Sequence, residues 1–427
     1  MTDVWLRALA DLWTSPFYYV ALLFVCLQVR KQIRIERQLF SVRLHSWRGE
    51  CWRIVLWGAC AGVLASALFL FIGASVTPGV LVTLWVIALT LSFIRIRYFC
   101  FAYAAGVLGM LQLIAHVFPA SAKMPGGIAM FWEMLRDMRM DSVLLLVGVL
   151  HLIEAFLVFR MADRLGTPLF FEGKRGKTVG GYHLQGFWPV PLLLLAPSAA
   201  EGAGMQLPWQ PLLGGAVWDG GWTALAFPVL IGFQSMTVSR LPAAKAREGA
   251  RRLVVFAAVM IAAGTAAEWY GELWFAAAAS VLSFALHELI VVLGKREEER
   301  CSPYFMHDDR GLKVLAVLPG SPAAELGIEA GNILHKVNSQ RIRGRADLHA
   351  ALRMNPAFTK LEVLNHEGQS KFVHRALYAN EHHQLGLILC PDDETMEVAV
   401  TREGGWLSFV RARRAAKSAA GGETISK

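Results

Sequence analysis

Charged residues are scarce in this chain. Asp, Glu, Lys and Arg make up 18% of its 427 residues, whereas hydrophobic residues make up 55%. Positions 54 to 94 contain no charged residue at all. Because an ordinary soluble domain carries about 25% charged residues, this composition excludes a soluble globular chain. It indicates an integral membrane protein with long apolar segments.

Paired cysteines are also missing. None of the cysteines forms a C-x-x-C pair, and the chain has six of them: Cys26, Cys51, Cys60, Cys100, Cys301 and Cys390. A disulfide framework or a zinc site is therefore disfavoured, and we interpret them as small buried hydrophobic residues. The N-terminus lacks a basic region and an A-x-A cleavage site, so we expect no removable signal peptide.

What the chain does contain is a series of apolar stretches. They lie at residues 12–29, 54–76, 80–94, 98–118, 142–159, 186–199, 222–239, 253–269 and 273–293. The stretch 186–199 is short and broken by three prolines, which predicts a kinked span or a re-entrant segment. The predicted fold of residues 1–298 is therefore an α-helical polytopic membrane bundle of about seven to nine spans.

Basic residues alternate along the loops between these stretches. Loops rich in Lys and Arg are 30–53, 95–97, 160–184, 240–252 and 295–300, and the loops between them hold few. The positive-inside rule then places the region after residue 298 in the cytoplasm. It also accounts for the net charge of +9 without a nucleic-acid partner. Segment 30–53 is predicted either as a basic amphipathic helix on an anionic leaflet or as a loop helix packed on the bundle.

Residues 311–332 carry the most specific pattern in the chain. They contain an apolar strand, a turn at Pro319-Gly320, a capped helix start at Ser321-Pro322 and a stop at Gly327. This order resembles the PDZ domain, a peptide-binding fold. We assign it residues 299–395, a small α/β domain, and interpret residues 396–427 as a basic, partly disordered tail. Asn332 and Ser339 depart from the family pattern, which usually has Asp and Gly at these places.

The PDZ resemblance implies binding of a peptide by strand addition, with an apolar pocket on a neighbouring helix. The predicted binding loop is Leu385-Gly386-Leu387-Ile388. The predicted pocket helix is 345–354, with Leu348 and Leu352 on the groove side. Two alternatives remain: residues 304–306 form the groove strand, or residues 385–389 are only a closing core strand. The ligand would be a free C-terminus or an internal segment.

Catalytic patterns are incomplete. An intramembrane metalloprotease needs H-E-x-x-H, but Val291 follows His287-Glu288 where the second His would stand. Ser283 lies one turn from His287, and we interpret this pair as a structural contact. We therefore predict no catalytic residue, no cofactor and no metal. An intramembrane protease or a regulator of one, with the PDZ-like domain docking substrate, stays open as the alternative, and a transporter is disfavoured because few charges lie in the spans.

The layout of the whole chain resembles the family of topological determinants of cell division in Gram-positive rod-shaped bacteria. The matching segments are residues 308–323, 360–368, 375–378 and 381–387. The resemblance implies a non-enzymatic, multi-pass adaptor at septum and poles. Its partners would be the lipid bilayer, a DivIVA-like coiled coil and a MinD-like ATPase of the MinC–MinD inhibitor. A homo-oligomer is possible.

Overall fold

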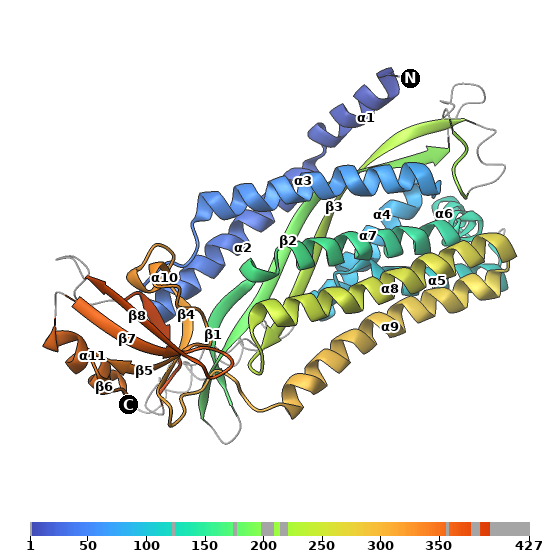
Figure 1. Cartoon of the computed structure of the whole chain (residues 1–427). Helices are drawn as coiled ribbons and strands as arrows, with labels where there is room; N and C mark the ends of the chain where they lie inside the picture. Colours follow the sequence, from blue (N-terminus) through green and yellow to red (C-terminus); the bar gives the residue numbers. More distant parts are fainter. Residues whose placement is uncertain are drawn as a thin grey trace, which may run out of the picture.

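The computed structural model describes residues 2–121, 124–173, 177–197, 209–213, 221–355, 358–376 and 385–392. They form an elongated helical bundle with a smaller α/β domain at one end (Figure 1). The tail predicted at 396–427 lies outside the described residues, and the predicted domain boundaries stay a prediction.

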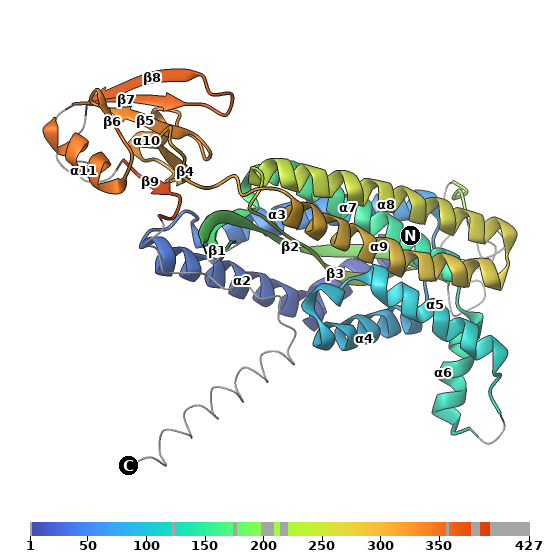
Figure 2. The same ribbon diagram turned by 90° about the horizontal axis from the view of Figure 1, so that it is seen from below.

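Nine helices belong to the described part of the bundle: α1 (Thr2–Thr14), α2 (Pro16–Phe40), α3 (Trp47–Ile72), α4 (Pro78–Ile94), α5 (Phe101–Val117), α6 (Gly126–Asp137), α7 (Met140–Arg160), α8 (Pro242–Tyr270) and α9 (Leu273–Arg300). Prolines begin α2, α4 and α8, and left-handed glycines end α3 and α8. The helix α6 projects away from the bundle (Figure 2).

Four of these helices, α3, α7, α8 and α9, are long and apolar enough to cross a membrane. A fifth span results if α1 and α2, which meet at a 49° bend, are counted together. The apolar helices α4 and α5 are shorter, at 17 residues each. The described residues thus indicate a membrane protein, but they do not confirm seven to nine helical spans.

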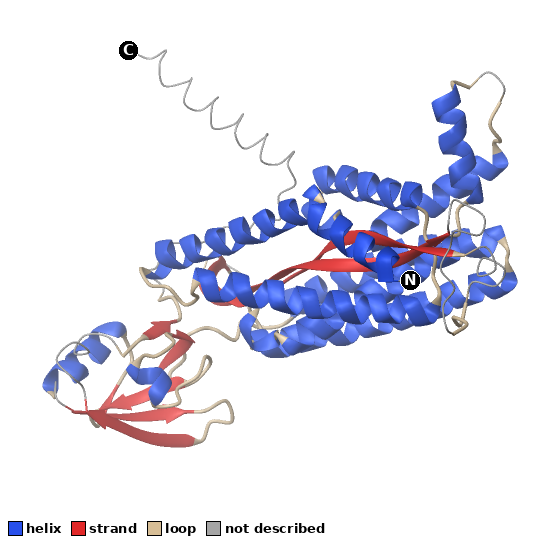
Figure 3. Cartoon of the chain, turned by 90° about the horizontal axis from the view of Figure 1, so that it is seen from above, coloured by secondary structure: helices blue, strands red, loops and turns tan. Residues whose placement is uncertain are grey.

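Two predicted spans are wrong, because residues 186–199 and 222–239 lie mainly in β-strands. The strands β1 (Gly166–Glu172), β2 (Thr178–Pro197) and β3 (Trp222–Thr237) form an antiparallel sheet in that order. Figure 3 shows this sheet running among the helices. Apolar residues occupy both faces of β2 and β3 over much of their length, so the sequence lacks the polar–apolar alternation that would distinguish these strands from a helix.

Prolines in β2 fit the strand rather than a kinked helix. The backbone N–H of Leu193 points away from β3 and donates to Ser66 Oγ of α3 at 2.9 Å. Pro191 and Pro189 lie two and four residues earlier, so their nitrogens face the same edge. Since proline has no N–H, this edge carries no unpaired donor at either position.

The edge of β2 that faces α3 is covered by helix backbone. A side chain at Gly58 or Gly62 would place its Cβ 2.4 or 2.3 Å from the carbonyl oxygens of Pro189 and Pro191. Two glycines four residues apart therefore let α3 contact the strand directly. An open sheet edge is tolerated inside a bilayer only when protein covers it, and α3 meets that requirement here.

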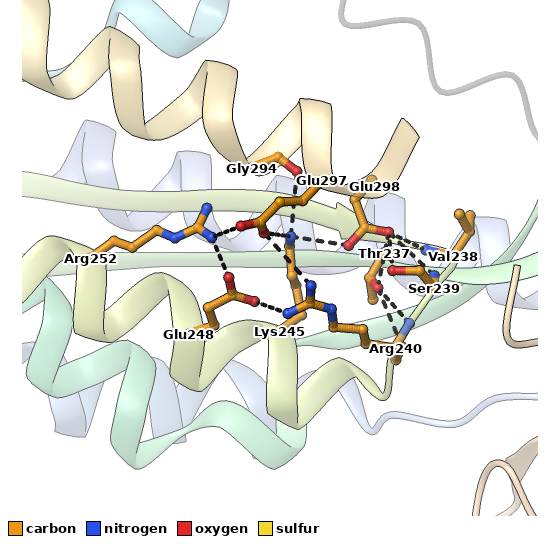
Figure 4. Close-up of polar contacts among 10 residues, drawn as sticks. All are labelled: Thr237, Val238, Ser239, Arg240, Lys245, Glu248, Arg252, Gly294, Glu297 and Glu298. Carbon is orange, nitrogen blue, oxygen red and sulfur yellow. Dashed lines mark hydrogen bonds and ion pairs between the residues drawn. The ribbon is translucent and has the colours of Figure 1, made fainter. Parts of the chain in front are cut away.

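Ion pairs fix the end of the bundle nearest the small domain (Figure 4). Glu298, in the last turn of α9, accepts hydrogen bonds from Val238 N at 3.1 Å and Ser239 Oγ at 2.9 Å. Lys245 of α8 lies 3.0 Å from the same carboxylate, and both side chains are buried. Arg252 joins Glu297 to Glu248 beside them. The chain therefore leaves α9 from a fixed position.

The small domain contains β4 (Leu312–Val317), α10 (Pro322–Glu325), β5 (Ile333–Val337), β6 (Gln340–Arg341), α11 (Arg345–Met354), β7 (Phe358–Leu364), β8 (Ser370–Ala376) and β9 (Leu387–Leu389). Its sheet has the order β8-β7-β5-β4-β9, and β6 pairs with β5. The predicted helix 345–354 and the hairpin around residues 366–368 are confirmed.

The small domain contacts the helical bundle directly. The Tyr182 hydroxyl of β2 donates to the carbonyl of Leu315 in β4. Gly180 N donates to Phe305 O at 3.0 Å, and the Phe305 side chain is fully buried. Ile388 belongs to the same hydrophobic cluster as the bundle helices. One face of the β4–β9 pair is therefore an internal interface.

Candidate peptide-binding site

The loop before β9 requires glycine. Gly386 has a φ of +74°, and a Cβ there would lie 2.2 Å from the Cβ of Ser321. Ser321 is itself held in place, because its hydroxyl accepts the N–H of Ala324 at 3.3 Å and caps α10. The predicted loop is therefore a tight turn packed on the start of α10.

The backbone of β9 points outward at Leu387. Leu318 N donates to Gly386 O at 2.9 Å across the Val317–Leu387 pair. In an antiparallel ladder this bond identifies Val317–Leu387 as a non-hydrogen-bonded pair. The N–H and C=O of Leu387 consequently face the edge opposite β4. Among the described strands, only β4 pairs with β9.

The turn contributes two further donors, the backbone N–H groups of Leu385 and Gly386. Leu385 O accepts the N–H of Ala323 at 3.0 Å, which fixes the orientation of the turn. Within the part of the chain that the structure describes, no acceptor contacts the N–H of Leu385 or Gly386. Successive N–H groups without acceptors favour a carboxylate or carbonyl oxygen.

The predicted apolar residues divide between two faces. Leu348 and Leu352 of α11 are each 7% exposed and share one cluster with Leu385. Leu387 is half-buried and packs against that cluster. Ile388 points to the opposite face, toward the bundle. The structure thus brings four of the six predicted residues, Leu348, Leu352, Leu385 and Leu387, into one apolar cluster, whereas Gly386 packs on Ser321 and Ile388 faces the bundle.

Sequence reasoning missed three polar residues that join α11 to the end of β9. Arg345 Nε lies 2.9 Å from Asp392 Oδ2, and His307 Nε2 lies 3.0 Å from Asp392 Oδ1. His307 Nδ1 accepts the N–H of Lys313 at 3.0 Å, so Nε2 carries the proton and donates to Cys390 O at 2.8 Å. Burial lowers the pKa of His307, which favours this neutral form. No local motif connects these positions, because they meet only in the folded domain.

The alternative groove strand at 304–306 lies elsewhere. Phe305 forms a β-bridge with Gly180 of the bundle, and the Tyr304 hydroxyl lies 3.1 Å from His366 Nδ1. Lys313 Nζ donates to Tyr304 O at 2.9 Å. This segment therefore joins the domain to the bundle, and its backbone is engaged there.

The predicted contact between Ser283 and His287 is wrong. Ser283 Oγ donates to Ala102 O of α5 at 3.1 Å instead. Glu288 accepts from Arg97 Nη2 at 2.6 Å and from the Tyr103 hydroxyl at 2.9 Å. Both carboxylate oxygens of Glu288 are thus engaged, and the His-Glu pair of α9 does not form a protease motif on that helix.

Comparison with known proteins confirms the family resemblance. Residues 313–364 match the PDZ domain family. The cell division topological determinant MinJ of Bacillus subtilis (strain 168) is 28% identical over 375 residues, which cover 87% of this chain and 91% of that protein. The probable cell division topological determinant MinJ of Lacticaseibacillus paracasei is 26% identical, covering 61% of this chain and 68% of that protein.

A solved structure also matches, the PDZ domain of an SdrC-like protein from Listeria monocytogenes. It is 13% identical and covers 20% of this chain and 92% of that domain, with a TM-score of 0.17. A score this low is too weak to support a shared fold by itself.

Proposed function

We propose that this chain, which is similar to the MinJ proteins over most of its length, is a membrane-anchored adaptor that helps to place the division site. The function of the small domain would be to recruit a division protein, an extended segment of which would pair with β9. The observation that carries the proposal is the outward-facing N–H and C=O of Leu387 beside α11.

Strand addition at β9 would use two kinds of contact. The ligand backbone would bond to Leu387, while its terminal carboxylate or an internal carbonyl would accept from the N–H groups of Leu385 and Gly386. Ligand side chains would pack toward Leu348 and Leu352 of α11. Specificity would come from these alternate side chains, because backbone bonds do not distinguish sequences.

Affinity at this edge would be low. Four backbone hydrogen bonds at about 0.5–1.5 kcal/mol each give about 2–6 kcal/mol, part of which the loss of rigid-body freedom offsets. Residence of both partners at one membrane raises their effective concentration, which would make a weak contact sufficient. The proposed mechanism therefore depends on the membrane anchor as much as on the domain.

The proposed location of the domain is the cytoplasm. Basic residues are concentrated at the C-terminal ends of α2, α7 and α9 and at the N-terminal end of α8. These ends of α2, α8 and α9 lie beside the small domain (Figure 1). The positive-inside rule supports a cytoplasmic side for this end. The family resemblance supports a DivIVA-like coiled coil and a MinD-like ATPase as partners, and septum and poles as sites of action.

A fluorescent fusion to the C-terminus of the full chain in dividing cells tests the proposal. We expect bright signal at septa and poles, and co-purification of division proteins with the wild-type chain. The variant Gly386→Ala should lose both, whereas Gly368→Ala, at a turn with open space around it, should keep both. Uniform membrane signal, or no retained division protein, would reject the adaptor.

A further inference from the structure

Three helices bring together side chains that peptide docking does not use. Cys100 precedes α5, His151 lies in α7 and His287 lies in α9. Cys100 Sγ is 3.2 Å from His151 Nε2 and 3.7 Å from His287 Nε2. All three ligand atoms lie within 4.8 Å of one another. Ionisable groups inside a membrane bundle are costly, so such a cluster needs a reason.

The His151 ring is oriented toward the cluster by its own helix. Its Nδ1 lies 2.7 Å from the carbonyl oxygen of Val147, which can only accept, so Nδ1 carries the proton. The Nε2 lone pair is consequently directed at Cys100. A backbone carbonyl that holds one ring nitrogen while the other faces the site is the usual arrangement of a metal-binding histidine.

Glu154, one turn along α7, is the candidate for a fourth ligand, and its carboxylate lies outside the group of three ligand atoms that are all within 4.8 Å of one another. Its carboxylate lies 4.0 Å from His151 Nε2, and the residue is 8% exposed. Cys100, His151 and Glu154 line a common cavity of about 30 Å³. Within the described residues, no Lys or Arg forms an ion pair with this carboxylate. Arg97, the nearby cation, is bound to Glu288 instead.

The distances among Cys100, His151 and His287, and the charge that Glu154 would add, match a divalent ion. Zn–S and Zn–N bonds of about 2.3 and 2.1 Å at a tetrahedral angle separate S from N by about 3.6 Å. The two observed S–N distances, 3.2 and 3.7 Å, bracket this value. One thiolate, one carboxylate and two neutral imidazoles around a 2+ ion have no net charge, which suits an apolar interior.

We propose that Cys100, His151 and His287 form a zinc-type metal site that joins α5, α7 and α9, and that the Glu154 side chain moves toward them on metal binding to supply the fourth ligand. With Glu154 in the fourth position, no position would be open for a substrate, so the proposed site is structural rather than catalytic. Metal binding replaces the thiol proton and draws the two imidazole nitrogens and the carboxylate inward. Glu288 is not a ligand, because Arg97 and Tyr103 hold it.

Metal titration of the full chain in detergent micelles tests this site. We expect the wild type to bind one equivalent of Co²⁺ with a thiolate-to-cobalt charge-transfer band, and Zn²⁺ to displace it. The variant Cys100→Ser should lose the band, and His287→Gln should weaken binding at least about tenfold. The control Cys60→Ser, an exposed cysteine on α3, should behave as wild type.

The wild-type spectrum decides the proposal even if a variant fails to fold. Absence of saturable Co²⁺ binding by the wild type would overturn it. So would a cobalt spectrum without the sulfur band, or an unchanged band in a folded Cys100→Ser protein. The adaptor proposal is tested separately, since division-protein binding to β9 does not involve these four residues.

Discussion

Replacing Gly386 by alanine should release β9 from the domain. The left-handed backbone, with φ at +74°, costs an alanine roughly 1–2 kcal/mol. Overlap of the new Cβ with Ser321, 2.2 Å away, adds about 1–3 kcal/mol. Together these terms raise the free energy of the β9-docked state by about 2–5 kcal/mol. Opening of this strand should then become about 30-fold to 4,000-fold more frequent.

Hydrogen exchange followed by mass spectrometry on the full chain measures this opening. Faster exchange should appear in peptides covering residues 312–318 and 385–392, whose ladder would be lost. The matched variant Gly368→Ala has a φ of +80° but nothing within 4 Å, so only the backbone term applies. Its effect should be confined to the β7–β8 hairpin. Unchanged exchange around β9 in Gly386→Ala would refute this account of the loop.

Three further outcomes follow from the structure. Gly62→Ala should destabilise the bundle by about 1–3 kcal/mol in thermal unfolding, because the new Cβ meets a backbone carbonyl of β2. The control Gly127→Ala, which has open space around it, should be neutral or stabilising. Equal melting temperatures of the two variants would argue against the contact between α3 and β2. Burial raises the pKa of Cys390 to about 12, so at pH 8 maleimide should label Cys301 well before Cys390. Equal labelling rates at the two cysteines would contradict the burial of Cys390. Burial lowers the pKa of His307, so the unfolded state binds the proton more readily than the folded state. The stability of the domain should therefore fall as the pH drops below about 6.5. Hydrogen-exchange protection of residues 385–392 that does not change from pH 7 to 5 would contradict this prediction.

The small domain was largely predictable because its signals are local. The cap at Ser321 and the spacing of Leu348 and Leu352 fix α10 and α11 within a few residues. The glycine at 386 marks the turn into β9 in the same way. Each of these features depends on neighbours in sequence, so the sequence alone contains the information.

The central sheet was not predictable from apolar runs. Apolar residues on both faces of β2, as at Trp188, Pro189 and Val190, remove the alternation of polar and apolar residues that identifies a strand. Proline positions held a usable signal, since Pro189 and Pro191 are two residues apart and face one edge. A two-residue spacing of prolines fits a strand edge better than a helix kink.

The cluster proposed to bind a metal could not be predicted from the sequence, for a different reason. Cys100 is separated from His151 by 51 residues and from His287 by 187 residues. No spacing rule links positions on three helices, and Cys100 taken alone has the pattern of a small buried hydrophobic residue. Only the packing of α5, α7 and α9 brings the donors together.

The outward edge of β9 is the central claim, and a photoreactive residue placed there tests it most directly. A diazirine-bearing analogue of similar size at Leu387, in the full chain in dividing cells, should form a covalent adduct with a division protein. The same group at Phe372, 74% exposed on β8 at the other edge of the sheet, should not. No adduct from Leu387, or the same adduct from both positions, would contradict the account.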